Sequence, residues 1–305
     1  MARLALYALG PVRLERDGVV VTVDTRKAIA LLVYLVLTGE HHTRDTLAGL
    51  LWPDYDQSHA RATLRRTLSA LKDATGAEAL DIAHDRLGLT ADADLVCDVT
   101  LFRALLASCA GHGHAASEVC ARCVAPLEQA AALFRGDLLA GFNLRDSPAF
   151  DDWQFFQQES LRRELAGALD RLARALAGQH AWEAAIAAAR RRLALDRLHE
   201  PAHRLLMQLY TRAGQRSAAL RQYRECVQVL DRELGVAPLD ATTRLYEAIR
   251  EHHSERLAEG QPSPPSALAA PTLTRAPEPP RPDAAPRVAG APAAPPLVGR
   301  EEEWA

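Results

Sequence analysis

Ser58 to Lys72 is the stretch whose residue types point most directly to a chemistry. Leu64, Leu68 and Leu71 recur at spacings of four and three, so a helix formed here turns them toward a core. The other side of this helix then carries Ser58, His59, Arg61, Ala62, Arg65, Arg66, Ser69 and Lys72, with Arg61 and Lys72 at its flanks. Such a face can meet the phosphates and base edges of duplex DNA, although the pattern also fits a solvated arginine-rich helix.

A second group of reactive side chains combines soft metal ligands within fifteen residues. Its members are Cys109, His112, His114, Cys120 and Cys123, the last two forming C-x-x-C. Thiolates and imidazoles at this spacing can close a tetrahedral structural zinc site. The alternative is a loop with incidental thiols. The sequence indicates no other cofactor, and Cys226 is expected to be an ordinary buried cysteine.

Short strands and capped helices must position the arginine-bearing helix. Aliphatic runs at 4–9, 12–15 and 19–23 are separated by turn residues that include Asp17-Gly18, which predicts a small antiparallel sheet. Asp24 or Thr25 can cap a first helix that Gly39 ends. Thr43 can cap a second helix, ended by Trp52-Pro53, with His41 and His42 in the loop before it. After the third helix, residues 80–90 read as a hairpin with Arg86 in its turn.

This order of elements resembles the winged-helix DNA-binding domain of response regulators and of streptomycete antibiotic regulatory proteins. The resemblance rests on Leu9-Gly10, Arg26-Lys27-Ala28, Leu50-Leu51-Trp52-Pro53, the helix from Arg61 to Leu71 and the hairpin. It implies that the helix Ser58–Lys72 enters the major groove and that Arg86 reaches the minor groove or its phosphates. The residues do not decide which arginine reads a base and which holds the backbone.

The chain beyond residue 95 is rich in alanine and leucine and contains an internal repeat. Leucines from 161 to 176 recur at helical spacing, and Gly178-Gln179 returns as Gly214-Gln215. This period resembles tetratricopeptide helix pairs. The stretches 134–142, 200–204 and 232–238 also resemble the bacterial transcriptional activator domain of the same regulators. That resemblance implies homodimers on DNA and contact with RNA polymerase.

The expected fold is therefore mainly α with a small β component. We expect a winged helix with an N-terminal sheet at 1–95, an all-α tetratricopeptide-like activator domain at 96–258 and a disordered linker at 259–296. Twelve of the eighteen prolines lie between residues 260 and 296. Residues 297–305 resemble the opening of a signalling ATPase module, which leaves open whether the sequence is a fragment or a remnant of a longer regulator. No G-x-x-x-x-G-K-[ST] occurs, so we expect no nucleotide bound through a P-loop.

Charge and composition limit the function classes. The chain of 305 residues has a net charge of −3, so nucleic-acid binding must come from a local patch. No export signal and no apolar run of membrane length occurs, which predicts a cytoplasmic protein without membrane contact.

Three functional interpretations follow, the first being a transcriptional activator that reads double-stranded promoter DNA. The second is a protein-interaction adaptor whose winged helix no longer binds DNA. Residues 1–94 support it, since they hold 11 Lys/Arg against 13 Asp/Glu. An enzyme is not expected, because no nucleophile, base and orienting group occur together.

Overall fold

The N-terminal sheet is built from the predicted strands and one further strand. In the computed structural model, which describes residues 3–90, 92–114 and 118–259, β1 (Leu4–Tyr7), β2 (Arg13–Arg16) and β3 (Val19–Val20) pair antiparallel. The other edge of β1 pairs in parallel with β7 (Leu95–Cys97), giving the order β3-β2-β1-β7. The prediction of a purely antiparallel sheet is therefore wrong, because β7 pairs with β1 in parallel. The three residues of β7 lie about 90 positions from their partner, so no hairpin turn signals the pairing.

Three helices follow the sheet, and their caps are side chains of the expected kind. Thr25 caps α1 (Arg26–Thr38), which Gly39 ends with φ 65°, a left-handed conformation that favours glycine. Thr43 caps α2 (Arg44–Leu51). Asp56 caps α3 (Gln57–Thr75) by accepting the backbone N–H groups of residues 58 and 59, so the helix starts one residue before the predicted stretch.

A three-stranded wing completes the N-terminal part. After the turn η1 (Ala77–Ala79), β5 (Leu80–Ile82) and β6 (Arg86–Leu89) form the predicted hairpin. The expectation that His41 and His42 lie in a loop is wrong for His42, because β4 (His42–Thr43) pairs with β6. Two residues give no periodicity from which this strand could be predicted.

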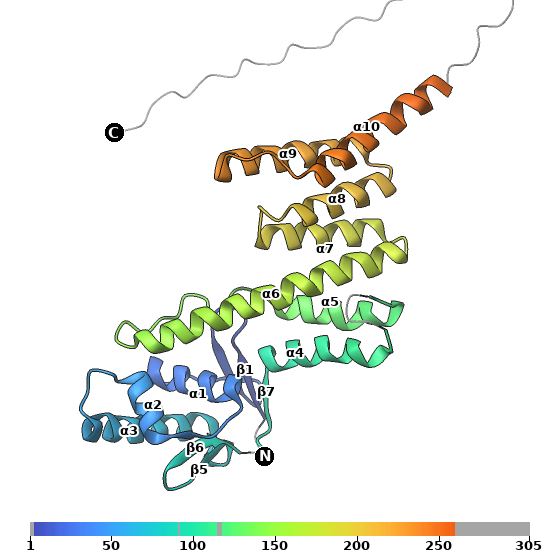
Figure 1. Ribbon diagram of the computed structural model, residues 1–305. Coiled ribbons are helices and arrows are strands. Elements are labelled where there is room, and N and C mark those ends of the chain that lie inside the picture. The colour runs from blue at the N-terminus through green and yellow to red at the C-terminus, as the bar shows by residue number, and fades with distance from the viewer. Residues whose placement is uncertain (1–2, 91, 115–117, 260–305) are drawn as a thin grey trace, which may run out of the picture. The chain divides into compact units, whose positions relative to one another are not determined.

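The remaining described chain is helical, and Figure 1 shows its helices stacked one on another. The elements are α4 (Asp98–Ser108), η2 (Cys109–His112), η3 (Ala121–Cys123), α5 (Val124–Leu133), α6 (Pro148–Gly178), α7 (Trp182–Leu195), α8 (Glu200–Arg212), α9 (Arg216–Leu234) and α10 (Asp240–Glu259). Helices α6 and α7 pack together, as do α8 and α9. Small buried side chains at the crossings, such as Ala185 and Ala219, let the helices approach closely.

The winged helix and the first helices of the helical domain share a hydrophobic core. This core contains Leu6 of β1, Leu64 of α3, and Phe150 and Leu161 of α6. Residues 1–260 accordingly form one compact unit. A second core fills the helical repeat. The predicted linker, 259–296, lies outside the described residues except for its first residue, which ends α10, and the segment 297–305 lies outside them entirely.

Candidate nucleic-acid interface

Helix α3 is anchored by the predicted leucines. Leu64, Leu68 and Leu71 are buried in the core of the winged helix. The opposite side contains the predicted interface residues: Ser58, His59, Arg61, Arg65, Arg66 and Ser69 are exposed, and Ala62 and Lys72 are half-buried. The leucines therefore fix the helix while the cations face outward.

The first turn of α3 is occupied by its own cap. The Ser58 hydroxyl donates to Oδ1 of Asp56 at 2.7 Å, and the rings of Tyr55 and His59 meet edge to face at 4.5 Å. The hydrogen bond from the Ser58 side chain, together with the His59 N–H, lowers the pKa of Asp56. A carboxylate held ionised at this end repels phosphates, so the attractive part of the face begins after the first turn.

Arg61 is engaged with a neighbouring helix. Its Nε and Nη2 atoms donate to the two carboxylate oxygens of Asp45 on α2, each at 2.5 Å. The Arg61 hydrogen bond lowers the pKa of Asp45. The pair joins α2 to α3 in the bidentate geometry that orients a guanidinium. Sequence reasoning missed this contact because Asp45 lies sixteen residues upstream on a different helix.

The other cations of the interface have no carboxylate partner in the described part of the chain. Among the described residues, Arg65, Arg66 and Lys72 of α3 form no ion pair, and neither does Arg86 at the start of β6. Arg86 lies at the first position of the strand and is exposed. Four positive charges therefore remain to attract an anionic ligand.

Arg44 joins the wing to α2, and it is not among the DNA-binding residues predicted from the sequence. Its backbone N–H donates to the carbonyl of Asp85 at 3.1 Å, and its Nε donates to the carbonyl of His84 at 3.2 Å. Both contacts hold the turn of the wing next to the start of α2. A basic residue directly after the Thr43 cap was the available sequence signal.

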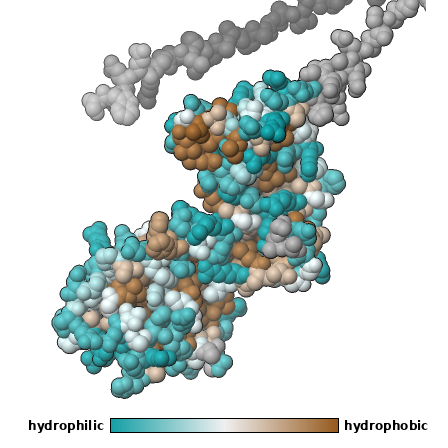
Figure 2. All heavy atoms as spheres, in the orientation of Figure 1, coloured by the Kyte–Doolittle hydropathy of each residue, from teal (hydrophilic) through white to brown (hydrophobic). Residues whose placement is uncertain are grey.

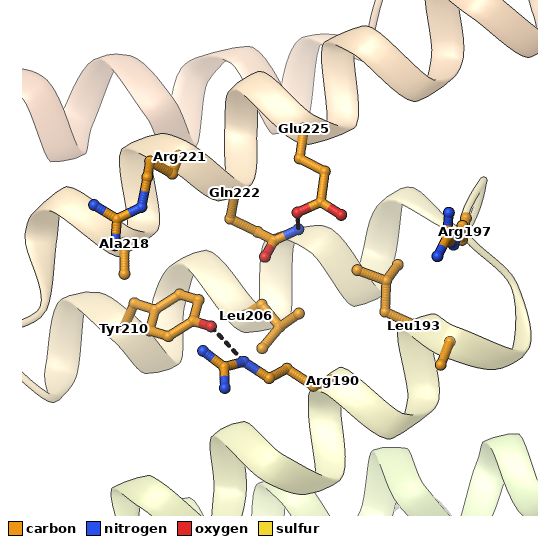
Figure 3. A pocket seen from close by; sticks show the side chains of 10 residues that line it. Arg190, Leu193, Arg197, Leu206, Tyr210, Ala218, Arg221, Gln222 and Glu225 are labelled. Atoms are coloured by element: carbon orange, nitrogen blue, oxygen red, sulfur yellow. Dashed lines mark hydrogen bonds between the residues drawn. The ribbon is translucent and has the colours of Figure 1, made fainter. Parts of the chain in front are cut away.

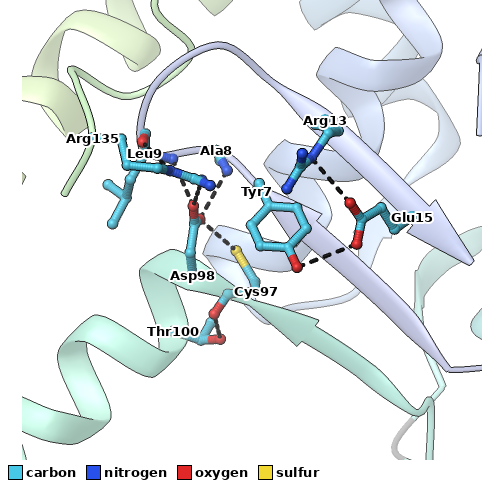
Figure 4. A network of polar contacts seen from close by, with 9 residues as sticks. All are labelled: Tyr7, Ala8, Leu9, Arg13, Glu15, Cys97, Asp98, Thr100 and Arg135. Atoms are coloured by element: carbon cyan, nitrogen blue, oxygen red, sulfur yellow. Dashed lines mark hydrogen bonds and ion pairs between the residues drawn. The ribbon is translucent and has the colours of Figure 1, made fainter. Parts of the chain in front are cut away.

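A buried carboxylate ties the sheet of the winged helix to the helical domain (Figure 4). Asp98, the first residue of α4, accepts the backbone N–H groups of Ala8 at 2.8 Å and Leu9 at 3.1 Å. Arg135 donates to the same carboxylate at 2.8 Å, and its guanidinium lies over the ring of Tyr7. Burial raises the pKa of Asp98, while these hydrogen bonds and Arg135 oppose the rise. No sequence motif predicted this junction.

The helical repeat contains an arginine-lined pocket of about 380 Å³ between α7, α8 and α9. Figure 3 shows Arg190 pointing toward the hydroxyl of Tyr210, to which it donates at 2.8 Å. Arg197 and Arg221 also line the pocket, with Glu225 at its edge. The pocket presents more positive than negative charge.

Four of the five predicted metal ligands lie together. The ligand atoms of His112, His114, Cys120 and Cys123 are all within 4.8 Å of one another. Cys109 is not part of this group; its buried thiol faces the carbonyl of Leu105 at 3.8 Å and also interacts with the thiol of Cys123.

The fold and these sites define a winged helix joined to a helical repeat domain. Residues 97–250 match the family model of the bacterial transcriptional activator domain. The structure is similar to a solved structure of Mycobacterium tuberculosis EmbR in complex with a low-affinity phosphopeptide, with a TM-score of 0.63 and 25% sequence identity over 85% of this chain and 70% of that chain. A comparison with curated protein sequences found no match.

The chain belongs to the family of the bacterial transcriptional activator domain. It is a transcriptional regulator of the streptomycete antibiotic regulatory protein type, and it is not an enzyme. These findings confirm the family and fold predicted from the sequence. No helix in the described part of the chain is long and apolar enough to cross a membrane.

Proposed function

We propose that this regulator binds promoter DNA with α3 in the major groove and with the wing on the adjacent backbone. The observation that carries the proposal is the pair Arg65 and Arg66, exposed and without ion pairs among the described residues, on a helix whose other side is buried. Arginine can pair bidentately with guanine or hold a phosphate. Arg86 of the wing adds a third contact to the backbone.

The positive charge of this interface is unevenly distributed along α3. This distribution predicts which part of the helix contributes most to the affinity for DNA. Asp45 neutralises Arg61, and Asp56 lies at the start of α3, so the second half of the helix contributes most of the attraction. Because the whole N-terminal part is slightly acidic, few other cations can replace Arg65 and Arg66. Losing both should therefore reduce affinity more than it would in a uniformly basic protein.

The test is a salt titration of DNA binding by fluorescence anisotropy, using duplexes selected from the source genome. Arg65→Ala/Arg66→Ala should weaken binding at least tenfold and lower the slope of log K against log [salt] by about 1 to 2, because one or two phosphate contacts are lost. Arg212→Ala/Arg224→Ala removes two exposed arginines from the helical domain and is the matched control. Equal affinity of both double variants, with unchanged circular dichroism, would reject α3 as the recognition helix.

A second candidate function is that of a protein-interaction adaptor, favoured by the arginine-lined pocket. The pocket is lined by Arg190, Arg197 and Arg221, whose positive charges can bind an acidic segment of a partner protein. If the chain acts as an activator, this partner would be RNA polymerase. A gel shift on random duplex at low salt separates the candidates, because a working winged helix retains non-specific affinity there. Absence of any shift would favour the adaptor.

We also propose that the regulator is a homodimer on DNA. Leu234, Val236 and Leu239, at the end of α9 and before α10, are 56%, 49% and 59% exposed. Figure 2 shows apolar atoms gathered at the α9 end of the helical stack. Exposed apolar clusters often mark protein contacts. Sedimentation of the DNA complex should give two chains per duplex site, and Leu234→Glu/Leu239→Glu should give one.

A further inference from the structure

The connection between α4 and α5 brings two histidines and two cysteines to one point. His112 ends η2, which continues α4, and His114 follows it after Gly113. Cys120 directly precedes η3 and Cys123 is the last residue of η3, which leads into α5. Residues 115–117, between the two halves, lie outside the described part of the chain. The ligand pairs thus come from the end of one helix and the start of the next.

The distances match those between the ligands of a tetrahedral metal ion. Zinc–sulfur bonds of about 2.3 Å and zinc–nitrogen bonds of about 2.0 to 2.1 Å place two sulfurs about 3.8 Å apart, and sulfur and nitrogen about 3.6 Å apart. The Sγ atoms of Cys120 and Cys123 are 3.7 Å apart, and Cys120 Sγ lies 3.5 Å from Nδ1 of His112. Cys123 Sγ lies 3.2 Å from Nδ1 of His112 and 3.1 Å from Nε2 of His114. Four of the six distances between ligand atoms are therefore close to those of a tetrahedral site, and the other two pairs lie within 4.8 Å.

Hydrogen bonding alone is a weaker account of this arrangement. Three potential partners converge on the Cys123 sulfur, yet a thiol carries one hydrogen and is a weak donor and acceptor. Cys123 is also fully buried, and the other three residues are half-buried. A cation at the centre would satisfy the converging lone pairs of all four side chains.

We propose that His112, His114, Cys120 and Cys123 bind one structural Zn²⁺ that fastens the end of α4 to the start of α5. Two thiolates and two imidazoles are a common zinc ligand set, and four protein ligands leave no position for a substrate. On binding, the metal replaces the thiol protons of Cys120 and Cys123, which pass to solvent, and nothing is oxidised or reduced. The fifth predicted ligand, Cys109, is not included.

The site would stabilise the helical domain at the end of α4 that lies away from the Asp98 junction. Cys123 belongs to the second hydrophobic core, together with Leu172 and Leu176 of α6. A metal ion at this point would couple the α4–α5 connection to that core. The unfolded chain does not hold the four ligands together, so the free energy of zinc binding adds to the stability of the folded chain.

The experiment is elemental analysis of the full chain after expression in zinc-supplemented medium and purification under reducing conditions. We expect about one zinc per chain in the wild type and in Cys226→Ala, which removes a buried thiol from α9. Cys120→Ser/Cys123→Ser should hold less than a tenth of that amount. A wild type without zinc would overturn the proposal, as would equal zinc in this double variant.

A second measurement covers the case in which the double variant fails to fold. His114→Ala removes one half-buried ligand, and its far-ultraviolet circular dichroism should stay helical while its zinc is lost faster to a chelator than that of the wild type. Cobalt introduced in place of zinc should give the visible d–d absorption of a tetrahedral cobalt site in wild type and Cys109→Ala. Loss of this absorption in Cys109→Ala with the fold intact, or unchanged chelator kinetics in His114→Ala, would contradict the assigned ligand set.

Discussion

Arg135, which follows α5, donates a hydrogen bond of 2.8 Å to Asp98, the first residue of α4. Because Asp98 also accepts the backbone N–H groups of Ala8 and Leu9, one carboxylate joins the end of β1 to two segments of the activator domain. Arg135 in turn donates to the carbonyl of Leu9. The start of α4 is thus held directly against the sheet of the winged helix.

The first prediction concerns this carboxylate. Asp98 is 3% exposed, and Asp98→Ala would leave two backbone N–H groups and Nη2 of Arg135 without their acceptor. We expect a loss of about 2 to 4 kcal/mol in the free energy of unfolding, measured by urea denaturation. Arg13→Ala is the control, since Arg13 also lies over the Tyr7 ring but does not contact Asp98, and it should cost less than about 1 kcal/mol. Similar losses in both variants would refute the central role of Asp98.

The second prediction is a pH dependence caused by His199. Its Nδ1 accepts the N–H of Ala202 and caps α8, which requires the neutral ring. Burial, and then the charge of Arg192, lower the pKa of His199 below its ordinary 6.5. The unfolded chain then binds the proton more readily than the folded chain. The stability contribution is therefore complete above pH 6.5 and is lost as the pH falls through the lower folded pKa.

Urea denaturation between pH 5 and pH 8 measures this effect. His199→Asn keeps an acceptor at the cap but does not titrate, so its stability should fall less than that of the wild type on acidification. His84→Gln removes an exposed imidazole from the wing and should retain the wild-type pH dependence. If His199→Asn also retains it, His199 is not the titrating group.

The third prediction concerns two thiols outside the Cys/His cluster. Burial raises the pKa of Cys97 to about 11, assisted by the charge of Asp98, and burial also raises the pKa of Cys226 to about 11. Thiolates are the reactive form, so neither residue should be alkylated by iodoacetamide at pH 8 in the folded protein. Mass spectrometry after brief labelling measures this, and a urea-unfolded sample is the control in which both must react. Rapid labelling in the folded state would contradict the described burial.

Local signals in the sequence were sufficient for much of this architecture. Caps at Thr25 and Thr43 and the leucine spacing of α3 depend on neighbouring residues, so the sequence shows them directly. The strand β7 and the Arg61–Asp45 pair depend on residues distant in the chain or on other elements, and no local pattern indicates them. The same holds for the Asp98 junction. The metal ligands were suggested by spacing alone, but the structure was needed to separate Cys109 from the other four.

The last prediction rests on the proposed DNA interface and uses the ion pair between Asp45 and Arg61. Both side chains are nearly half exposed, at 43% and 45%, so the pair adds little stability, and Asp45→Asn should leave the free energy of unfolding nearly unchanged. The substitution removes a negative charge from the interface and releases Arg61 toward the phosphates. DNA affinity at low salt should therefore rise several-fold, and the salt slope should steepen by about 0.9 if one phosphate contact is gained. Asp231→Asn removes an exposed carboxylate from α9 and should leave both quantities unchanged. Weaker binding by Asp45→Asn would instead mean that the pair orients Arg61 for a base, because only a positioned guanidinium reads guanine bidentately.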